Sequence, residues 1–205
     1  RSLPGEALEA DIVRLGEGGD GIAETEGGRL YVPLTVPGDR VRVLPMRPRG
    51  DGFAARLLEV VCTGPGRTQP PCPHFGVCGG CTLQHLADDA YAAWKMARVT
   101  TALARAGLAD CRIHPLVRTP PGSRRRATFA AARSAGGAMQ LGFQVREAHR
   151  IVDLAVCPVL EPAIAALLAP LRRLLSGILP AGARASVSAT LLDSGLDVLV
   201  QGWSP

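Results

Sequence analysis

The chain has 205 residues, of which 47% are hydrophobic and 20% are charged, and its formal net charge is +5. This length permits one large domain or two small ones, and the composition is ordinary for a globular protein. No run of about 18 apolar residues occurs, which argues against a membrane-spanning helix, and the first residues lack the apolar core of a signal peptide. We therefore expect a cytoplasmic protein without a membrane partner. Because the chain starts at Arg1, we also expect it to be a piece of a longer protein.

Arginine carries almost all of the positive charge. Lys95 is the only lysine, so arginine supplies the other 22 of the 23 basic residues. Guanidinium groups bind phosphate through paired hydrogen bonds, which makes phosphate recognition one explanation of this bias. A GC-rich genome is the other explanation, and composition alone does not separate the two.

Short strands separated by turn residues are expected in the first 61 residues. The turn Glu26-Gly27-Gly28, for example, has the composition of a hairpin. Five short strands without a helical period favour a small closed barrel of the oligonucleotide-binding type. Because such barrels often bind nucleic acid, the arginines on these strands are candidate phosphate contacts. They are Arg40, Arg42, Arg47, Arg49 and Arg56. The alternative is that they are solvated residues on the outer face of the barrel.

Three cysteines gather in the stretch Cys72-Pro-His-Phe-Gly-Val-Cys78-Gly-Gly-Cys81. The two glycines permit a tight turn that leaves both flanking thiols on one side. Converging thiolates repel one another, so this stretch requires a metal ion, a cluster or oxidation. In a reducing compartment clustered cysteines more often bind metal than form disulfides. The stretch therefore predicts a metal or iron–sulfur site.

A fourth cysteine ligand can come from Cys62, Cys111 or Cys157. Cys157 is preferred because Pro158 follows it, and a Cys-Pro step stiffens the turn at many cluster sites. A zinc ribbon would show two Cys-x2-Cys pairs, and only one is present, so zinc is the second choice. We expect a [4Fe–4S] cluster. Its ligands would be Cys72, Cys78, Cys81 and Cys157.

Residues after the cysteine stretch alternate between helical and extended patterns. A helix is expected over 86–106, and a second from Pro162, which Pro170 should kink or split. Asp193-Ser194-Gly195 predicts a hairpin near the end of the chain.

Arg124, Arg125 and Arg126 begin a β segment that 139–145 should pair with. Side chains alternate between the two faces of a strand, so at least one of these arginines would face the interior unless that side is open. A groove for a polyanion on one face is the functional interpretation. A solvated edge strand is the alternative.

The motif Cys-Pro-His-Phe-Gly-Val-Cys-Gly-Gly-Cys-x-x-Gln-His resembles the iron–sulfur motif of the S-adenosylmethionine-dependent RNA uracil-5-methyltransferases. These are the 23S ribosomal RNA (uracil-5-)-methyltransferases and their relatives. Residues 5–62 resemble the TRAM domain of that family. Arg124-Arg125-Arg126 with Leu141-Gly142-Phe143 resembles its central domain, and Cys157-Pro158-Val159-Leu160 resembles the segment with the fourth ligand. The resemblance covers nearly the whole chain.

The resemblance implies an α+β fold in two domains. Residues 1–62 would form a small OB-like β-barrel (TRAM) that binds RNA. Residues 63–205 would form an α/β central domain with a mainly antiparallel sheet and the cluster, and helix 86–106 would pack towards the methyltransferase domain. The family's glycine-rich S-adenosylmethionine loop, nucleophilic cysteine and general base are not found before Pro205. The Rossmann-like methyltransferase domain is therefore expected to be absent from this chain.

The same resemblance implies a function. The chain would be the N-terminal RNA-binding, [4Fe–4S]-containing part of an RNA (uracil-5-)-methyltransferase acting on rRNA or tRNA, with S-adenosylmethionine bound only in the full-length enzyme. In that enzyme a cysteine thiolate attacks C6 of the uracil, C5 is methylated and a proton is removed. The cluster would be structural, and no catalytic residue is assigned here. The expected RNA contacts are Arg124, Arg125, Arg126, Phe143, Arg42, Arg47 and Arg49.

Two other classes of protein remain possible on the sequence. One is a stand-alone nucleic-acid-binding module with a structural zinc or iron–sulfur site. The other is an electron-transfer protein, which would need an exposed cluster that is reduced reversibly.

Overall fold

The computed structural model describes residues 5–146 and 148–203, and the chain folds as two compact units. Unit 1 consists of Arg1–Pro70 and Thr82–Val117, and unit 2 of Pro71–Cys81 and Arg118–Pro205. This division differs from the boundary expected at residue 62, because the cysteine stretch joins unit 2 whereas the long helix joins unit 1. Among the described residues no helix is both long and apolar enough to cross a membrane.

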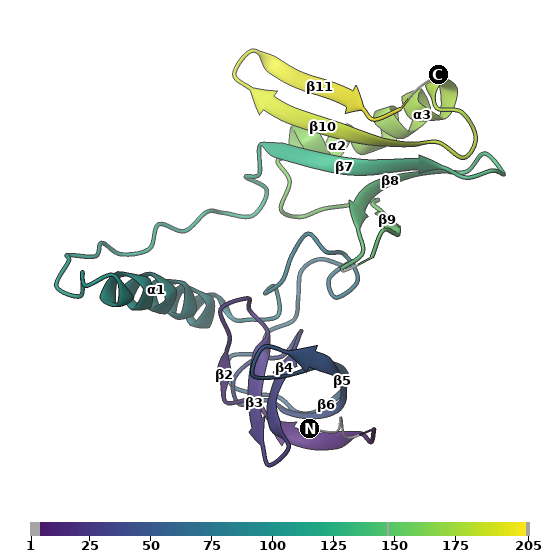
Figure 1. Cartoon of the computed structure of the whole chain (residues 1–205). Coiled ribbons are helices and arrows are strands. Elements are labelled where there is room, and N and C mark those ends of the chain that lie inside the picture. Colours follow the sequence, from purple (N-terminus) through teal and green to yellow (C-terminus); the bar gives the residue numbers. More distant parts are fainter. Residues whose placement is uncertain (1–4, 147, 204–205) are drawn as a thin grey trace. The chain divides into compact units, whose positions relative to one another are not determined.

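Unit 1 contains a six-stranded sheet that curls round a small apolar core (Figure 1). Its order is β1-β5-β6-β4-β3-β2, and β4 and β6 pair in parallel whereas the other neighbours are antiparallel. The strands are β1 (Leu8–Asp11), β2 (Arg14–Leu15), β3 (Gly21–Thr25), β4 (Gly28–Val32), β5 (Arg40–Arg49) and β6 (Gly52–Cys62). The hairpin expected at Glu26-Gly27-Gly28 is confirmed, since β3 pairs with β4 there.

Alternation along the strands of unit 1 explains its core. In β5 the apolar Val41 and Val43 are fully buried, whereas Arg40 and Arg42, which alternate with them, are exposed. Buried residues from the other strands, such as Leu30 and Phe53, complete the cluster. The helix α1 (Asp88–Arg105) confirms the helix expected over 86–106, and none of its residues is buried.

Unit 2 is built on a five-stranded antiparallel sheet of order β11-β10-β7-β8-β9. The strands are β7 (Arg126–Arg133), β8 (Met139–Gln144), β9 (Ile151–Asp153), β10 (Arg184–Leu192) and β11 (Gly195–Gln201). The hairpin predicted at Asp193-Ser194-Gly195 is confirmed by the pairing of β10 with β11. The pairing predicted between the arginine segment and 139–145 is confirmed as β7 with β8.

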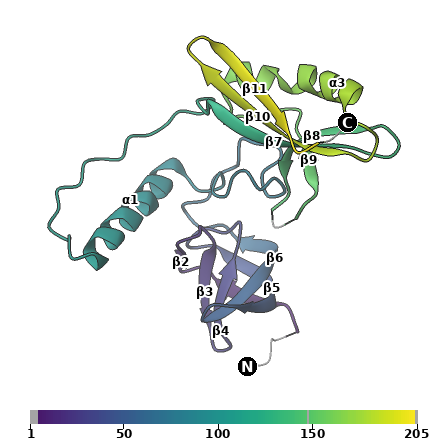
Figure 2. The ribbon, with the colours of Figure 1, turned by 45° about the horizontal axis from the view of Figure 1, so that its top comes forward.

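Two helices, α2 (Pro162–Ala166) and α3 (Leu168–Ile178), cover one face of this sheet (Figures 1 and 2). Their buried leucines and Ile164 pack with Phe129, Leu141 and Val187 from the sheet. The break between the helices confirms the split expected near Pro170. Pro170 lies in the first turn of α3, where its missing N–H leaves no helical bond unmade.

Candidate functional site

The four cysteines expected to be ligands line one small cavity in unit 2. Cys72, Cys78 and Cys81 come from the loop before α1, and Cys157 follows β9 along the chain. The remaining walls are mainly apolar and include Phe75, Phe143, Leu154 and Val159. The cavity has a volume of about 10 Å³, which is room for about one water molecule. The fold therefore gathers the four thiols that the sequence could only suggest.

Backbone hydrogen bonds hold the cysteine loop against the sheet. Within the loop, the Cys78 N–H donates to the His74 carbonyl at 2.9 Å. The Gly79 N–H donates to the Gln144 carbonyl at 2.9 Å, so the loop is pinned to the end of β8. A Cβ on Gly79 would lie 2.9 Å from that carbonyl oxygen, which explains why a residue without a side chain is needed there.

Burial governs the ionisation of Cys78. It raises the pKa of the Cys78 thiol above its usual range, although the Gly80 N–H, 3.4 Å from Sγ, favours the thiolate. The neighbouring Cys157 and Cys72 raise this pKa further, because adjacent thiolates repel each other. All six cysteines are free of disulfide bonds. An uncompensated set of thiolates is therefore disfavoured in this cavity.

No three His, Cys, Asp or Glu side chains among the described residues are arranged to hold a single metal ion. A cluster does not require side chains arranged round a single ion, because each thiolate binds a different iron atom. The cavity that the four cysteines share is therefore a separate observation. The four-cysteine ligand set accordingly stays a prediction.

The arginine triplet lies at the start of β7 and is wholly exposed. Arg124 donates from Nε to the Arg126 carbonyl at 3.1 Å and lies over the Phe143 ring, 6.0 Å from its centroid. Arg125 pairs with Asp193 at 2.8 Å. None of the three faces an interior, and only Arg126 belongs to the strand, so the condition that this side of the sheet is open applies. Phe143 packs against Phe129 at a centroid distance of 5.3 Å and is partly buried.

Several of the arginines expected to bind phosphate in unit 1 already have carboxylate or aromatic neighbours. Arg42 pairs with Glu59 at 3.4 Å across β5 and β6. Arg49 pairs with Asp20 at 2.6 Å and stacks over the Tyr31 ring at 4.7 Å. Arg47 is exposed on β5. Their role in binding RNA stays a prediction.

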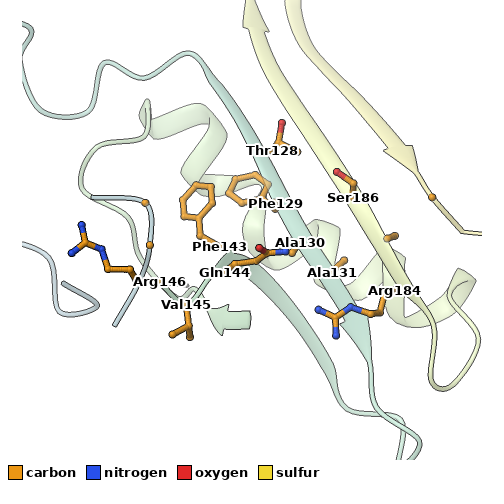
Figure 3. A pocket seen from close by; sticks show the side chains of 14 residues that line it. Thr128, Phe129, Ala130, Ala131, Phe143, Gln144, Val145, Arg146, Arg184 and Ser186 are labelled. Atoms are coloured by element: carbon orange, nitrogen blue, oxygen red, sulfur yellow. The ribbon is translucent and has the colours of Figure 1, made fainter. Parts of the chain in front are cut away.

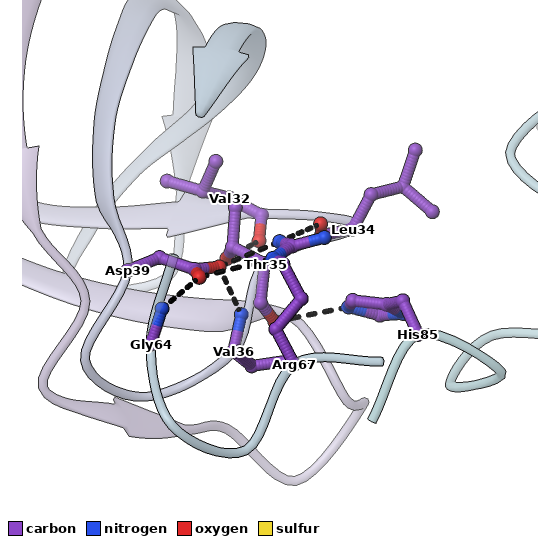
Figure 4. Close-up of polar contacts among 8 residues, drawn as sticks. All are labelled: Val32, Leu34, Thr35, Val36, Asp39, Gly64, Arg67 and His85. Atoms are coloured by element: carbon purple, nitrogen blue, oxygen red, sulfur yellow. Dashed lines mark hydrogen bonds and ion pairs between the residues drawn. The ribbon is translucent and has the colours of Figure 1, made fainter. Parts of the chain in front are cut away.

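An ionic network centred on Asp39 was not foreseen from the sequence (Figure 4). The Asp39 side chain is fully buried and accepts hydrogen bonds from Arg67 at 3.0 and 2.6 Å, and from the Val36 and Gly64 N–H groups. Burial raises the pKa of Asp39, but these hydrogen bonds outweigh it and hold the pKa below its usual range. The residues Pro37-Gly38-Asp39 indicate a turn, but they do not indicate that Asp39 pairs with Arg67, 28 residues away.

The face of the unit 2 sheet opposite α2 and α3 carries a second, larger cavity (Figure 3). We call the side of β7, β8 and β10 that bears Thr128, Ala130, Gln144, Arg184 and Ser186 the open face. The cavity on it has a volume of about 690 Å³. The small and hydroxyl-bearing residues that line this cavity form no sequence motif. Along β7 they alternate with the buried Phe129 and Ala131, and this alternation marks the two faces of the strand.

The two units differ in net charge. Unit 1 contains 13 basic and 13 acidic residues, so its formal charges cancel. Unit 2 contains ten arginines and five acidic residues, so the difference of +5 equals the net charge of the whole chain. The positive charge of this protein thus belongs to unit 2.

Curated proteins similar to this chain are RNA methyltransferases by name. An uncharacterised RNA methyltransferase of Brucella suis biovar 1 is 40% identical over 93% of this chain, and one of Caulobacter vibrioides is 38% identical over 93%. A 23S rRNA (uracil(1939)-C(5))-methyltransferase of Halomonas elongata is 39% identical over 80% of this chain. The chain spans 44%, 45% and 34% of these relatives, respectively. No model of a known protein family matches it.

Among solved structures, the chain resembles the Pyrococcus abyssi tRNA (uracil-54, C5)-methyltransferase, which was crystallised with S-adenosyl-L-homocysteine. The TM-score is 0.63 at 22% identity, and the match covers 94% of this chain and 45% of the other. This similarity establishes the fold.

These comparisons correct the fold class and the function predicted from the sequence. The family resemblance implies a TRAM-like barrel and an iron–sulfur domain that form an N-terminal RNA-binding part without the methyltransferase domain. That assignment is wrong, because nearly the whole chain matches a methyltransferase that carries S-adenosyl-L-homocysteine, and its relatives are named methyltransferases. The physical reason is that strand and turn patterns specify local hairpins, and they do not specify the part of an enzyme to which those hairpins belong. The chain is thus similar over most of its length to RNA methyltransferases, and it shares its fold with a tRNA uracil-C5 methyltransferase.

Proposed function

We propose that this chain acts in an S-adenosylmethionine-dependent RNA methyltransferase that methylates C5 of a uracil. The observation that carries the proposal is the agreement of two independent comparisons. One relative is named a 23S rRNA uracil-C5 methyltransferase, and the structural neighbour is a tRNA uracil-C5 methyltransferase. The chemistry that these two proteins share is transfer to uracil C5, so the substrate class is rRNA or tRNA.

The proposed reaction is balanced without an external oxidant. A thiolate adds to C6 of the uracil, which makes C5 nucleophilic. C5 then accepts the methyl group of S-adenosylmethionine, and S-adenosylhomocysteine is the product. A general base takes the C5 proton, the electron pair of that C–H bond forms the C5=C6 double bond, and the thiolate leaves C6, which restores the uracil ring. The target base has to leave its stack to reach such a site. We assign the attacking thiolate to none of the cysteines in this chain.

The cysteine cavity is proposed to hold an iron–sulfur cluster through Cys72, Cys78, Cys81 and Cys157. The donor set fits such a group, since four cysteines line one cavity, and burial that raises the pKa of Cys78 disfavours its uncompensated thiolate. The cavity, at about 10 Å³, would have to widen to admit it. A bound cluster would supply positive charge that favours the thiolates. The cysteines would then tie the loop at 72–81 to the segment at 157 and stabilise unit 2, without a redox step.

The test uses the full-length protein that contains this chain, purified without oxygen. It is incubated with tritiated S-adenosylmethionine and with rRNA or tRNA from a strain that lacks the gene, and the RNA is digested to nucleosides. We expect label in 5-methyluridine. Label in another nucleoside, or none in either RNA with a properly folded protein, would contradict the proposal.

The same preparation tests the cluster through its iron content and absorption spectrum. We expect a brown protein with about four irons per chain, as a [4Fe–4S] cluster requires. A colourless protein that carries one zinc ion would show instead that the four thiols hold a single metal.

A further inference from the structure

The open face of the unit 2 sheet is lined by small and polar residues. Along β7, the buried Ala127, Phe129 and Ala131 point towards the helices, so Thr128 and Ala130 point the other way. Strand pairing extends this surface across the sheet. Thr128 lies opposite Ser188, with their hydroxyl oxygens 3.1 Å apart, and Ala130 lies opposite both Ser186 and Gly142. The result is a surface of hydroxyl and methyl groups. A layer of large apolar side chains in this place would need to be covered, and this surface does not.

The cavity on this surface is wide enough for part of a polymer. Its volume of about 690 Å³ falls within the range of about 300–1,000 Å³ that is usual for ligand sites. Small residues form much of the lining, including Ala130, Ala131 and Gly79, so a ligand can approach the backbone closely. Gln144 supplies an amide that can donate to and accept from a base edge.

Two arginines flank the cavity, Arg146 and Arg184, and Gln144 lies between them in the view of Figure 3. Arg184 donates from Nη2 to the His149 carbonyl at 2.7 Å. A carbonyl oxygen carries no net charge, so this bond orients the guanidinium and leaves its positive charge in place. Two described acidic residues share this side by strand register: Asp197 lies opposite Thr190 further along β10, and Asp153 lies opposite Gly142 and pairs with Arg172. The excess charge of +5 on unit 2 adds to the local field.

We propose that the open face binds a single-stranded segment of the RNA substrate, with Arg184 and Arg146 on backbone phosphates and Thr128, Ser186 and Gln144 beside the nucleotides. This proposal rests on the proposed function, since it names the surface by which the methyltransferase would hold its RNA. Single strands are recognised through splayed nucleotides and their 2′-hydroxyls, which a shallow cavity rich in hydroxyls and amides can accommodate. Guanidinium groups at its sides supply the charge that tracks a phosphate backbone.

The experiment measures binding of a fluorescein-labelled (U)15 RNA to the full-length protein by anisotropy, between 50 and 200 mM KCl. Arg184→Gln and Arg146→Gln are each expected to weaken binding by about fivefold to tenfold and to reduce the salt slope by about 0.7, the loss of one phosphate contact on a single strand. Ser186→Glu, which adds a negative charge to the floor, is expected to weaken binding at least as much. Arg184→Lys keeps the charge and should retain most of the affinity.

Arg173→Gln is the matched control. Arg173 is exposed on α3, on the covered side of the same sheet, and its replacement removes the same charge from the same unit. We expect less than a twofold change. If the variants at Arg184 and Arg146 bind RNA as well as Arg173→Gln does, the open face is not the RNA surface.

Methyl transfer by the unaltered protein separates this outcome from a failure of the proposed function. If it forms 5-methyluridine while the open-face variants bind normally, the function stands and the surface is wrong. If it forms none while Arg184→Gln still weakens binding, the surface stands and the reaction is wrong. Thermal unfolding of each variant identifies any loss of binding that is caused by unfolding.

Discussion

The two units use the same residue type in opposite ways. In unit 1, arginines are matched by carboxylates, as in Arg42 with Glu59 on the neighbouring strand and Arg49 with Asp20 just before β3, and the unit is neutral. In unit 2, Arg125 and Arg172 pair with carboxylates, but Arg133 and Arg184 donate to carbonyl oxygens, and arginines exceed acidic residues by five. The excess of arginine over lysine in the whole chain therefore has no single structural role. Unit 1 uses its guanidiniums for internal pairing, whereas unit 2 retains a positive charge that can act on a ligand.

The largest effect is expected at the cysteine cavity of unit 2. Cys157→Ser removes the ligand that joins the distant segment to the loop, so the full-length protein should lose its iron completely, from about four atoms per chain. The measurement is an iron assay with an absorption spectrum under anaerobic conditions. Cys111→Ser is the control, because Cys111 is exposed and lies outside the cavity. Unchanged iron in Cys157→Ser, or loss of iron in Cys111→Ser, would show that the ligand set is wrong.

The next largest effect is expected in unit 1, at its buried ion pair. Asp39→Asn leaves the Arg67 charge without its partner, and breaking a buried pair costs about 3–5 kcal/mol of the free energy of unfolding. Hydrogen exchange followed by mass spectrometry measures this effect for each unit. We expect faster exchange of amides in unit 1, while unit 2 amides serve as the internal control. Equal loss of protection in both units would show that their stabilities are not separable.

The same carboxylate predicts an acid limit for unit 1. Since the pKa of Asp39 is lowered on folding, its contribution is present above the unfolded pKa of about 3.9 and is lost as the pH falls through the lower folded value. Exchange protection of unit 1 in the unaltered protein should therefore decline more steeply below about pH 4 than in Asp39→Asn, whose side chain does not titrate. Parallel curves for the two proteins would contradict this assignment.

A moderate effect is expected on the reactivity of Cys78 in iron-free, reduced protein. Because burial raises the pKa of this thiol, less thiolate is available at a given pH, and alkylation by iodoacetamide should be slower than in the unfolded chain. Peptide mapping after labelling at several pH values gives the midpoint for Cys78 in the folded and the urea-unfolded protein. We expect a higher midpoint in the folded protein. A midpoint that is equal or lower would mean that the cavity stabilises the thiolate.

The smallest effect is expected from Arg42→Gln in unit 1, which sharpens the contrast with Arg184→Gln in unit 2. Both residues of the Arg42–Glu59 pair are more than half exposed, so the pair should contribute less than about 1 kcal/mol to stability. Because unit 1 is neutral, the affinity for (U)15 RNA should change by less than twofold. Thermal unfolding and anisotropy measure the two quantities. If Arg42→Gln lowers the affinity for RNA as much as Arg184→Gln does, the strand arginines of unit 1 belong to the RNA-binding surface.

Local patterns predicted the secondary structure well where the signal is local. The hairpin at Asp193-Ser194-Gly195, the helix α1 and the split near Pro170 all depend on neighbouring residues, and all are confirmed. The arginine triplet shows the limit of such patterns. Periodicity placed it on a strand, but the strand begins only at Arg126, because no local feature fixes where pairing with β8 and β10 starts.

Three features of the sites required the tertiary structure. The partner of Asp39 comes from 28 residues away, and Cys157 is brought beside the cysteine loop from the far side of β9. The open face has no motif, because serine, threonine and alanine are common residues and their meaning depends on which side of the sheet they occupy. The family resemblance also implied the wrong part of the enzyme, because a fold that many proteins share does not by itself identify the part of an enzyme to which it belongs.

The sequence by itself determined the elements, the cysteine spacing and the excess of arginine over lysine, because these are properties of neighbouring residues and of composition. Only the tertiary structure decided which arginines are neutralised, which cysteines share a cavity and which face of the sheet stays uncovered. Charge compensation and burial depend on distances between segments far apart in the chain, and strand register sets those distances. That register gave carboxylate partners to Arg40 and Arg42 of β5 and left Arg184 beside a carbonyl oxygen.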